Sequence, residues 1–376
     1  MACYQLIILL LQQLFRCLVV IFLLCGPSYN NSLLAQVYQL DTITELPETV
    51  RETSGLLFRN GVLITHNDSG GEPVLYALDT LTGDVTREVR ITNASNVDWE
   101  DLAADANYLY IGDFGNNVGN RTDLRIYRVP WSLYETQDTV LADTIAFAYA
   151  EQTDFSDQYL QHRFDAEALI VVNDSLHLHT KNWIADTSYR YQLPITPGSY
   201  TVTADLSWQV PGLITASSWS ANEAALLQTG YNILGQAFVL DEVDGVRNVW
   251  LPPLQGSQKV EAIAWSSPSS AFLTTEATGT LPARLYRLTI DRTVGTVEGL
   301  TELSWRVYPQ PASTWLRVEA TEPMVDYTLY DATGRQVLRT RTNPVDISVL
   351  SSGHYVLLVR TKTGQQLQRQ VAIFRP

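Results

Sequence analysis

The chain after about residue 36 alternates apolar and polar positions over short segments, without a sustained helical period. Such segments, rich in Val, Thr and Tyr and separated by Gly, Pro, Asn or Asp, predict β-strands. From residue 51 to residue 291 one pattern of strands recurs in the sequence. The predicted first strands of its copies begin at Glu52, Trp99, Ala166, Thr215 and Val260.

Each copy continues through a tight turn into a second and a third apolar strand, and four copies show a fourth, outer strand, which in the third copy is YTVTADLSW. Four antiparallel strands that recur roughly every 45 to 70 residues are typical of a β-propeller. The last copy lacks a clear fourth strand, and VYQLDTITEL near Val37 can supply it and close the ring without an exposed edge. We therefore predict an all-β propeller of five blades. Six blades is the alternative, because the second copy is long, and a two-sheet sandwich is a further one.

A second set of short alternating strands begins at Val307, with turns near Gly334, Gly353 and Gly364. This spacing predicts a small Ig-like β-sandwich. The blocks YPQPAS, LYDATGRQVL and LSSGHYVLLV resemble, in this order, the C-terminal sorting domain of type IX secretion cargo in Bacteroidetes-type bacteria, although Gln310 stands where the family usually has Asn. The resemblance implies the type IX secretion machinery as a partner and passage across the outer membrane. An ordinary Ig-like domain is the alternative.

The N-terminal segment has a long apolar core interrupted by Gln12, Gln13 and Arg16. This pattern predicts a cleaved signal peptide, with an uncleaved anchor or a lipoprotein modified at Cys25 as alternatives. All 3 cysteines lie in this segment, so the remaining chain has no disulfide. The predicted organisation is a signal peptide at 1–35, the propeller at 36–292, a linker at 293–304 and the sorting domain at 305–376.

The formal net charge of −15 disfavours nucleic acid and anionic membranes as partners. It suits a soluble extracellular protein that binds cations. The predicted signal peptide and the type IX resemblance imply export across the inner and outer membranes, so that the protein is secreted or held at the cell surface.

The first strand of each propeller blade lines the central channel, and the copies place Glu at one register there. These residues are Glu52, Glu100, Glu167 and Glu261. Carboxylates around one axis repel each other unless a positive group lies between them. Calcium takes several oxygen ligands, so the four glutamates are a candidate calcium site. In the structural alternative they accept backbone N–H groups from the neighbouring blade.

The ends of the predicted second strands form another ring, whose mixed chemistry favours a functional site. The ring contains His66, Asp68, Asp113, Lys181 and Glu276. The candidate catalytic residues are His66, Asp113 and Lys181. The candidate ligand-binding residues are Asp68, Asn116, Asn117, Arg121 and Glu276. The GDFGNN stretch can also be a plain turn with Asx hydrogen bonds, and no nucleophile, zinc or P-loop motif is recognisable.

The blocks ETSGL, THNDSG, VDWEDLA and LYIGDFGNN of the first two copies resemble a family of secreted bacterial propellers. This family is distantly similar to phytase-like, SdiA-regulated and TolB-like propellers. The phytase-like resemblance implies calcium in the channel and phosphoester chemistry. Phosphate, however, requires positive groups, and the predicted cluster is mostly acidic.

Three functions remain open. The first is a propeller that binds an extracellular ligand at its channel mouth with the help of calcium. The second is a calcium-dependent hydrolase of phosphoesters or other esters that acts through a metal-bound water. The third is a structural or surface-interaction protein without a small-molecule site. We rank ligand binding first.

Overall fold

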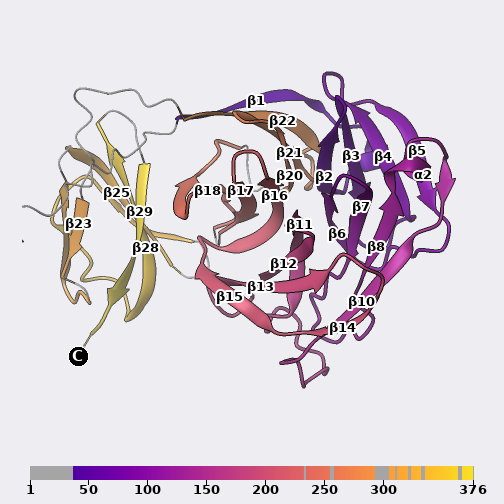
Figure 1. The fold of residues 1–376 in the computed structure, drawn as a ribbon. Coiled ribbons are helices and arrows are strands. Elements are labelled where there is room, and N and C mark those ends of the chain that lie inside the picture. The colour runs from indigo at the N-terminus through magenta and orange to yellow at the C-terminus, as the bar shows by residue number, and fades with distance from the viewer. Residues whose placement is uncertain are drawn as a thin grey trace, which may run out of the picture. The chain divides into compact units, whose positions relative to one another are not determined.

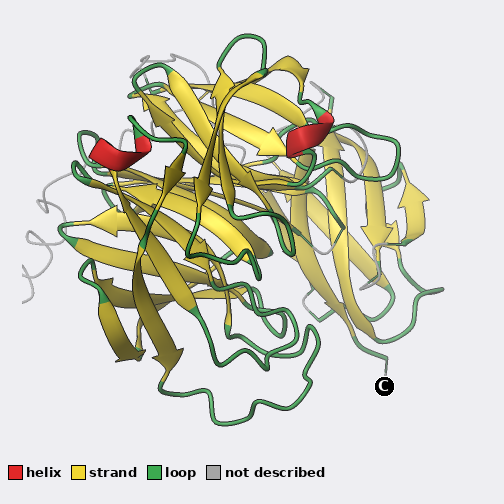
Figure 2. Ribbon diagram, turned by 90° about the vertical axis from the view of Figure 1, so that its right-hand side faces the viewer, coloured by secondary structure: helices red, strands yellow, loops and turns green. Residues whose placement is uncertain are grey.

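The structure is a computed structural model that describes residues 37–232, 234–254, 258–292, 305–309, 311–320, 323–331, 335–362 and 366–375. The predicted signal peptide and linker lie outside these residues. Strands make up nearly all of the regular structure (Figure 2), which confirms the all-β class. The helical elements of the described ranges are the short turns η1 (Glu48–Val50) and α2 (Trp131–Tyr134). No helix within the described ranges is long and apolar enough to cross a membrane.

Five sheets surround a central channel in the described part of residues 37–292, as the first prediction required (Figure 1). Blade 1 contains β2 (Thr53–Arg59), β3 (Val62–Asn67), β4 (Val74–Asp79), β5 (Val85–Ile91) and β9 (Thr139–Val140). Blade 2 contains β6 (Trp99–Ala104), β7 (Tyr108–Asp113), β8 (Arg125–Pro130), β10 (Asp143–Tyr149) and β14 (Gly198–Val202). Blade 3 contains β11 (Asp165–Val172), β12 (Ser175–Lys181), β13 (Thr187–Pro194) and β15 (Ala204–Gln209). Blade 4 contains β16 (Leu213–Ser220), β17 (Ala225–Tyr231), β18 (Ala237–Val243) and β19 (Val246–Trp250).

Blade 5 closes the ring by joining the two ends of the propeller. It contains β20 (Val260–Ser267), β21 (Ser270–Thr275), β22 (Arg284–Asp291) and β1 (Val37–Glu45). Strand β1 pairs antiparallel with β22 from Val37 opposite Asp291 to Glu45 opposite Arg284. The predicted N-terminal strand therefore supplies the missing outer strand of the last blade, and β22 is not left as an open sheet edge.

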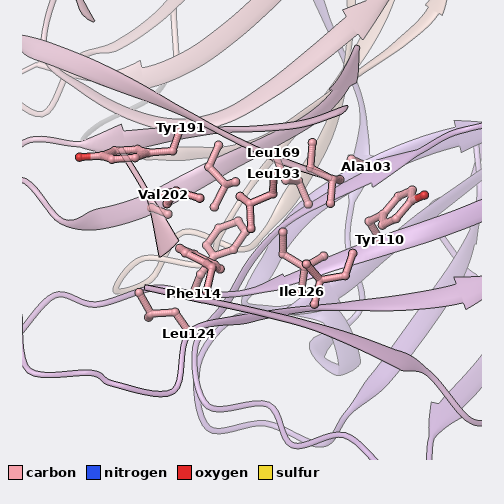
Figure 3. Packing of buried hydrophobic residues seen from close by; sticks show 14 of the residues in the cluster. Ala103, Tyr110, Phe114, Leu124, Ile126, Leu169, Tyr191, Leu193 and Val202 are labelled. Carbon is pink, nitrogen blue, oxygen red and sulfur yellow. The ribbon is translucent and has the colours of Figure 1, made fainter. Parts of the chain in front are cut away.

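The five first strands, β2, β6, β11, β16 and β20, contact one another in a closed circle at the centre of the ring. A cluster of buried apolar side chains fills each space between neighbouring blades. Figure 3 shows the cluster between blades 2 and 3, where Phe114 and Ile126 of one blade meet Leu169 and Tyr191 of the next. Burial of this apolar surface is the main force that holds the blades together.

Several hairpins have turns in which two consecutive residues have positive φ, and the residues at these positions are of types that adopt this conformation readily. Asn60 and Gly61 connect β2 to β3, with φ of 51° and 82°. Asp244 and Gly245 connect β18 to β19, with φ of 51° and 76°. Asn, Asp and Gly accept this left-handed conformation, which matches the twist of the paired strands.

The sequence predicted one outer strand, YTVTADLSW, where the structure has two. Strand β14 pairs parallel with β10 of blade 2, and β15 pairs antiparallel with β13 of blade 3. The chain thus passes from one blade to the next within this segment, which no local pattern reveals. The extra length of the second copy forms α2, β9 and long connections, so it holds no sixth blade in the described residues.

The C-terminal region forms two sheets. One contains β23 (Trp305–Tyr308), β24 (Trp315–Ala320) and β27 (Val345–Asp346). The other contains β26 (Gln336–Thr340), β25 (Met324–Tyr330), β28 (Gly353–Thr361) and β29 (Gln366–Ile373). Their alternating apolar residues, such as Leu316, Leu329 and Leu357, form one buried cluster. This is the small β-sandwich that the alternation predicts.

Candidate functional site

A β-bulge interrupts the first strand of every blade at the same depth in the channel. The pairing registers shift at Ser54/Leu56, Trp99/Leu102, Ala166/Ala168, Ile214/Ala216 and Val260/Ala262. The extra residues are therefore Gly55, the pair Glu100 and Asp101, Glu167, Thr215 and Glu261. A bulge re-aims a side chain relative to the regular pleat. The recurrent Glu of the sequence is thus the bulge residue of blades 2, 3 and 5.

Blade 1 departs from this pattern, and the predicted role of Glu52 is corrected. Glu52 lies before β2 and is exposed, whereas the bulge residue is Gly55. Gly55 has a φ of +64°, and a Cβ there would lie 2.7 Å from Nε2 of His66 and 2.9 Å from the backbone N of Leu102. Only glycine fits this close approach of blades 1 and 2.

At the level of the bulges, Asp101 links blades 2, 3 and 4 across the middle of the channel, which we call the waist. Its Oδ2 accepts backbone N–H groups from Leu169 of blade 3 at 2.8 Å and Ser217 of blade 4 at 3.2 Å. Its Oδ1 accepts the N–H of Leu102 at 2.8 Å. The waist also includes Thr215, whose Oγ1 donates to the carbonyl of Val260 at 2.6 Å. Asp101, not the recurrent Glu, therefore makes the backbone contacts that the structural alternative assigned to Glu.

Above the waist, three carboxylates from blades 1 and 2 converge at one mouth of the channel. Asp68 follows β3, Asp98 precedes β6, and Glu100 lies in β6. Carboxylate oxygens of the three lie within 4.8 Å of one another, in a group that could hold a metal ion. We call these residues the acidic triad. Asp98 and Glu100 are two positions apart, a spacing that places side chains on the same side of an extended chain.

The backbone beyond β7 is shaped to receive these carboxylates. A Cβ at Gly115 would lie 2.0 Å from Oε1 of Glu100 and 2.5 Å from Oδ2 of Asp98. The backbone N–H groups of Phe114 and Gly115 both donate to the carbonyl of Asp98 at 3.1 Å. The side chains of Asp98 and Glu100 thus lie against a residue that has none, and any other residue there would displace them.

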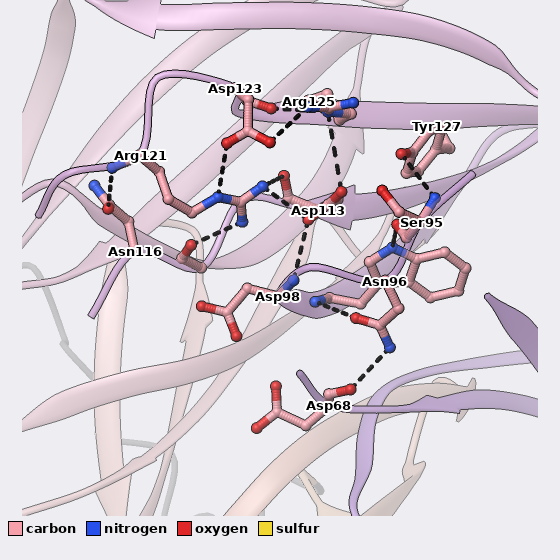
Figure 4. A network of polar contacts seen from close by, with 12 residues as sticks. Asp68, Ser95, Asn96, Asp98, Asp113, Asn116, Arg121, Asp123, Arg125 and Tyr127 are labelled. Atoms are coloured by element: carbon pink, nitrogen blue, oxygen red, sulfur yellow. Dashed lines mark hydrogen bonds and ion pairs between the residues drawn. The ribbon is translucent and has the colours of Figure 1, made fainter. Parts of the chain in front are cut away.

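Asp113 and Arg121 hold this loop in place through hydrogen bonds (Figure 4). Asp113 is fully buried, and its Oδ1 accepts the N–H of Asp98 at 3.1 Å and a guanidinium N–H of Arg121 at 3.0 Å. Arg121 also donates to the carbonyl of Gly115 at 2.9 Å and to Asp123 at 3.1 Å. Together they fix the backbone on which Asp98 and Gly115 lie.

Burial raises the pKa of every member of the acidic triad, and the charges of Lys181 and Arg121 offset this rise only in part. Burial raises the pKa of Asp68 to about 6. Burial, together with the charges of Asp68 and Asp165, raises the pKa of Asp98 to about 7. Burial and the charge of Glu167 raise the pKa of Glu100 well above its usual value. Such shifts show that each carboxylate would be stabilised by a cation at this point.

The other side of the mouth is a mixed array from blades 3 to 5. Nζ of Lys181 lies 2.6 Å from Oε1 of Glu167, and Nζ of Lys259 lies 3.3 Å from Oε1 of Glu276 and 3.9 Å from Oε1 of Glu261. Burial disfavours the charge of Lys181, yet the carboxylates of Glu167 and Glu261 outweigh it and hold its pKa well above the usual value. Glu167 and Glu261 therefore already have ammonium partners, unlike the acidic triad.

The structure brings only part of the predicted site together. Of the four glutamates proposed as metal ligands, Glu100 joins Asp68 and Asp98, Glu167 and Glu261 pair with lysines, and Glu52 lies outside. Asp98 was not singled out, although its position two residues before Glu100 was a usable signal.

Several other predicted residues serve the scaffold. His66 is fully buried, lies edge-on to Trp99, and has a pKa lowered by burial to about 4, so it does not fit a catalytic base. Asn116 is engaged in hydrogen bonds within the protein: its backbone N–H donates to Asp165, and its Nδ2 donates to the carbonyl of Phe164. Asn117 contributes its carbonyl, which accepts the N–H of Leu160 at 3.0 Å.

At the opposite end of the first strands is a separate hollow of about 180 Å³, which no charged side chain of the described residues lines. Its walls include Phe58, Leu102, Ile170, Trp219 and Trp265. The waist separates this hollow from the acidic mouth, so the two ends of the channel differ in chemistry.

Comparison with known proteins identifies the tail. Residues 306–373 match the family described as the secretion system C-terminal sorting domain. The predicted type IX sorting domain is thereby confirmed. A search of curated proteins with the whole sequence finds no match.

A search of solved structures matches a chain of the mitotic checkpoint complex, with 12% identity, a TM-score of 0.31, and coverage of 62% of this chain and 61% of that one. The WD40 β-propeller domain of Doa1 has 10% identity and a TM-score of 0.32, with 61% of this chain and 62% of that chain covered. A structural genomics protein of unknown function from Bacteroides thetaiotaomicron VPI-5482 has 7% identity and a TM-score of 0.40, with 68% and 76% covered. The chain thus spans about three fifths of the first two. The propeller assignment rests on the strand topology described above.

The strand topology and the tail together define the class of protein. The chain is a five-bladed propeller followed by a type IX secretion sorting domain, which directs it for export to the outer membrane, the cell surface or the medium.

Proposed function

We propose that this exported propeller binds a calcium ion through the acidic triad and, with it, an extracellular ligand at the same mouth. The observation that carries the proposal is the state of Glu100. This residue is only 5% exposed, and its carboxylate has no hydrogen bond or ion pair to any described residue. A buried carboxylate without donors is costly unless a cation lies beside it.

The donor set fits a hard cation. Asp68, Asp98 and Glu100 offer only carboxylate oxygens, and Oδ1 of Asp68 is buried without a hydrogen-bond partner in the described structure. Calcium takes six to eight oxygen ligands at about 2.3–2.6 Å, more than the one oxygen from each carboxylate that the triad brings together. Positions would remain for oxygen atoms of water or of a ligand. This supports ligand binding through calcium, the function ranked first from the sequence.

The two alternative functions, a hydrolase and a structural protein, explain fewer features of the acidic mouth. A phosphoester hydrolase of the phytase-like kind needs cations that are free to hold phosphate. Arg121, Lys181 and Lys259 each have a carboxylate partner within 3.3 Å. A purely structural role accounts for the waist but gives no reason to bury Glu100 without a donor.

The decisive experiment is calorimetric titration of the metal-free protein with calcium, with magnesium as the comparison. We expect one calcium site per chain and an increase in melting temperature. At about one hundred times the dissociation constant, binding adds about 2.7 kcal/mol of stability. For a domain of this size, that corresponds to a shift of about 5–10 °C.

Glu100→Gln is the test variant, because it keeps the size of the side chain and removes its charge. We expect Glu100→Gln to lose calcium binding and to be more stable than the wild type without metal. Glu88→Gln is the matched control, since Glu88 is exposed on β5. If the wild type gives no calcium heat, or if Glu100→Gln binds calcium like Glu88→Gln, the proposal is wrong.

A further inference from the structure

The interface between blades 3 and 4 is built differently from the other four. Its cluster of buried apolar residues, which includes Trp208, Ile214 and Phe238, is smaller than the clusters described at the other interfaces. Beside this cluster lies a cavity of about 340 Å³ between the two sheets. This volume is in the range of small-molecule sites. The cavity is separate from the acidic triad, whose members do not line it.

One part of the cavity wall is apolar and rigid. It includes Ile170, Leu206, Trp208, Trp219 and Leu226. The rings of His179 and Trp208 meet edge to face, with centroids 5.1 Å apart. Nδ1 of His179 also contacts Oγ of Ser217 at 3.0 Å and Nε2 of Gln228 at 3.1 Å, and these three residues are buried. The ring of Trp208 therefore packs against a histidine that is itself held by two buried side chains.

Another part of the wall is polar but charge-compensated. Arg190 makes two hydrogen bonds to Asp205, at 3.0 and 2.6 Å. Arg247 pairs with Glu242 and also lies over the ring of Trp208, 5.0 Å from its centroid. Each guanidinium thus has a carboxylate beside it, and Asp244 adds a further carboxylate to the wall, so the cavity offers donors and acceptors without an uncompensated positive charge among the described lining residues.

His177 gives the strongest indication of a ligand. It is 7% exposed and lines the cavity, and no described residue forms a hydrogen bond or ion pair with its ring. His177 and His179 are two positions apart in β12, so both project from the same face of the strand. His179 has partners and His177 has none among the described residues. The ring nitrogens of His177 therefore face the cavity and can bond to whatever occupies it, water or a ligand.

We propose that this cavity is a second binding site and that it takes one pyranose ring of a neutral sugar. A pyranose has a face of C–H groups, which packs on aromatic rings such as Trp219, and hydroxyl groups around its edge. Those hydroxyls both donate and accept, which matches the paired Arg and acidic side chains and the free ring of His177. An anionic sugar finds no uncompensated cation among the described lining residues, and a fully apolar ligand would leave the polar side of the cavity unsatisfied.

The proposal is tested by calorimetry on the full protein in the presence of chelator, so that it does not depend on calcium. The probes are the methyl glycosides of glucose, galactose and mannose, N-acetylglucosamine and cellotriose, with sodium glucuronate as the charged comparison. We expect at least one neutral probe to bind with a dissociation constant of about 1 mM or below. Trp219→Ala and His177→Gln should each weaken that binding about tenfold, equivalent to about 1.4 kcal/mol.

Trp315→Ala is the matched control, because Trp315 is 43% exposed in the C-terminal sandwich and does not line the cavity. Asp68→Asn is the second control, and both should bind the sugar as the wild type does. If Trp219→Ala fails to fold, the sugar affinity of His177→Gln alone tests the proposal. Lack of binding by every neutral probe, unchanged affinity in His177→Gln, or tenfold tighter binding of glucuronate would each overturn the proposal.

Discussion

The waist and the acidic mouth of the channel are built from adjacent residues of one strand, yet they use their carboxylates in opposite ways. Asp101 at the waist accepts three backbone N–H groups, from blades 2, 3 and 4. Glu100, one residue earlier, accepts none from the described residues and lies against Asp68 and Asp98 instead. Both side chains are buried.

The difference teaches that burial does not identify a functional carboxylate in this channel. Burial raises the pKa of both Glu100 and Asp101, but only Asp101 has backbone donors that oppose the shift. Donors stabilise a carboxylate in place and make it part of the scaffold. Glu100, without donors, makes no such contact with the described scaffold and is available to an ion. We therefore expect mutations in the two regions to change the free energy of unfolding in opposite directions.

The largest effect is expected at the waist. Asp101→Ala leaves the N–H groups of Leu102, Leu169 and Ser217 without their acceptor in a dry part of the channel. An unsatisfied buried donor costs about 1–3 kcal/mol, so the variant should lose about 4 kcal/mol of unfolding free energy. Urea denaturation measures this loss directly.

Asp101→Asn provides the control for the waist, because it retains one acceptor oxygen. Its loss should be smaller than that of Asp101→Ala. A change below about 1 kcal/mol in Asp101→Ala would contradict the idea that Asp101 joins the blades.

The architecture was accessible from the sequence because propeller blades repeat a local pattern. Alternation, turn residues and the missing outer strand of the last copy predicted five blades and the closure by β1, and the structure confirms both. The outer strand of the third copy was the error. Whether residues 198–202 pair with β10 or with β13 depends on a contact between distant segments, which local periodicity does not encode.

The candidate site was only partly accessible, for a physical reason. A β-bulge adds a residue to one strand and shifts every later side chain, and the sequence does not show where it lies. Glu52 was therefore aligned with Glu100, although the bulge of blade 1 is at Gly55. Asp98 was missed because it precedes β6, where a strand-based alignment does not count it.

A change in stability of intermediate size is expected for a mutation at the mouth, and it is opposite in sign to the change at the waist. The pKa of Asp98 is raised from 3.8 to about 7, so the folded protein keeps a proton that the unfolded chain loses between these values. Stability of the metal-free wild type therefore falls as pH rises through this window. Asp98→Asn has no such proton, so its advantage over the wild type should grow as pH rises from 4 to 8, by at most about 1.4 kcal/mol per pH unit.

This prediction is checked by melting curves of both proteins in chelator across that pH range. Their difference cancels the contribution of buried histidines such as His66 and His179, whose lowered pKa values act in the other direction. A difference that stays constant with pH would show that Asp98 is ionised throughout and has a partner that compensates its charge.

The smallest effect is expected for Glu52→Gln, and it separates the two versions of the acidic site. Glu52 contacts its neighbours through its backbone, since its carbonyl accepts the N–H of Asp68 at 2.8 Å and its N–H donates to Asn67 at 3.2 Å. Glutamine preserves both contacts. The exposed charge acts on Asp68 only at a distance, and solvent screens such an interaction to about 0.5 kcal/mol or less. The affinity for calcium should therefore fall by about twofold or less in a titration matched to that of Glu100→Gln. A loss as large as that of Glu100→Gln would instead place Glu52 among the ligands, and the ring of glutamates that the repeats predict would describe the site better than the acidic triad does.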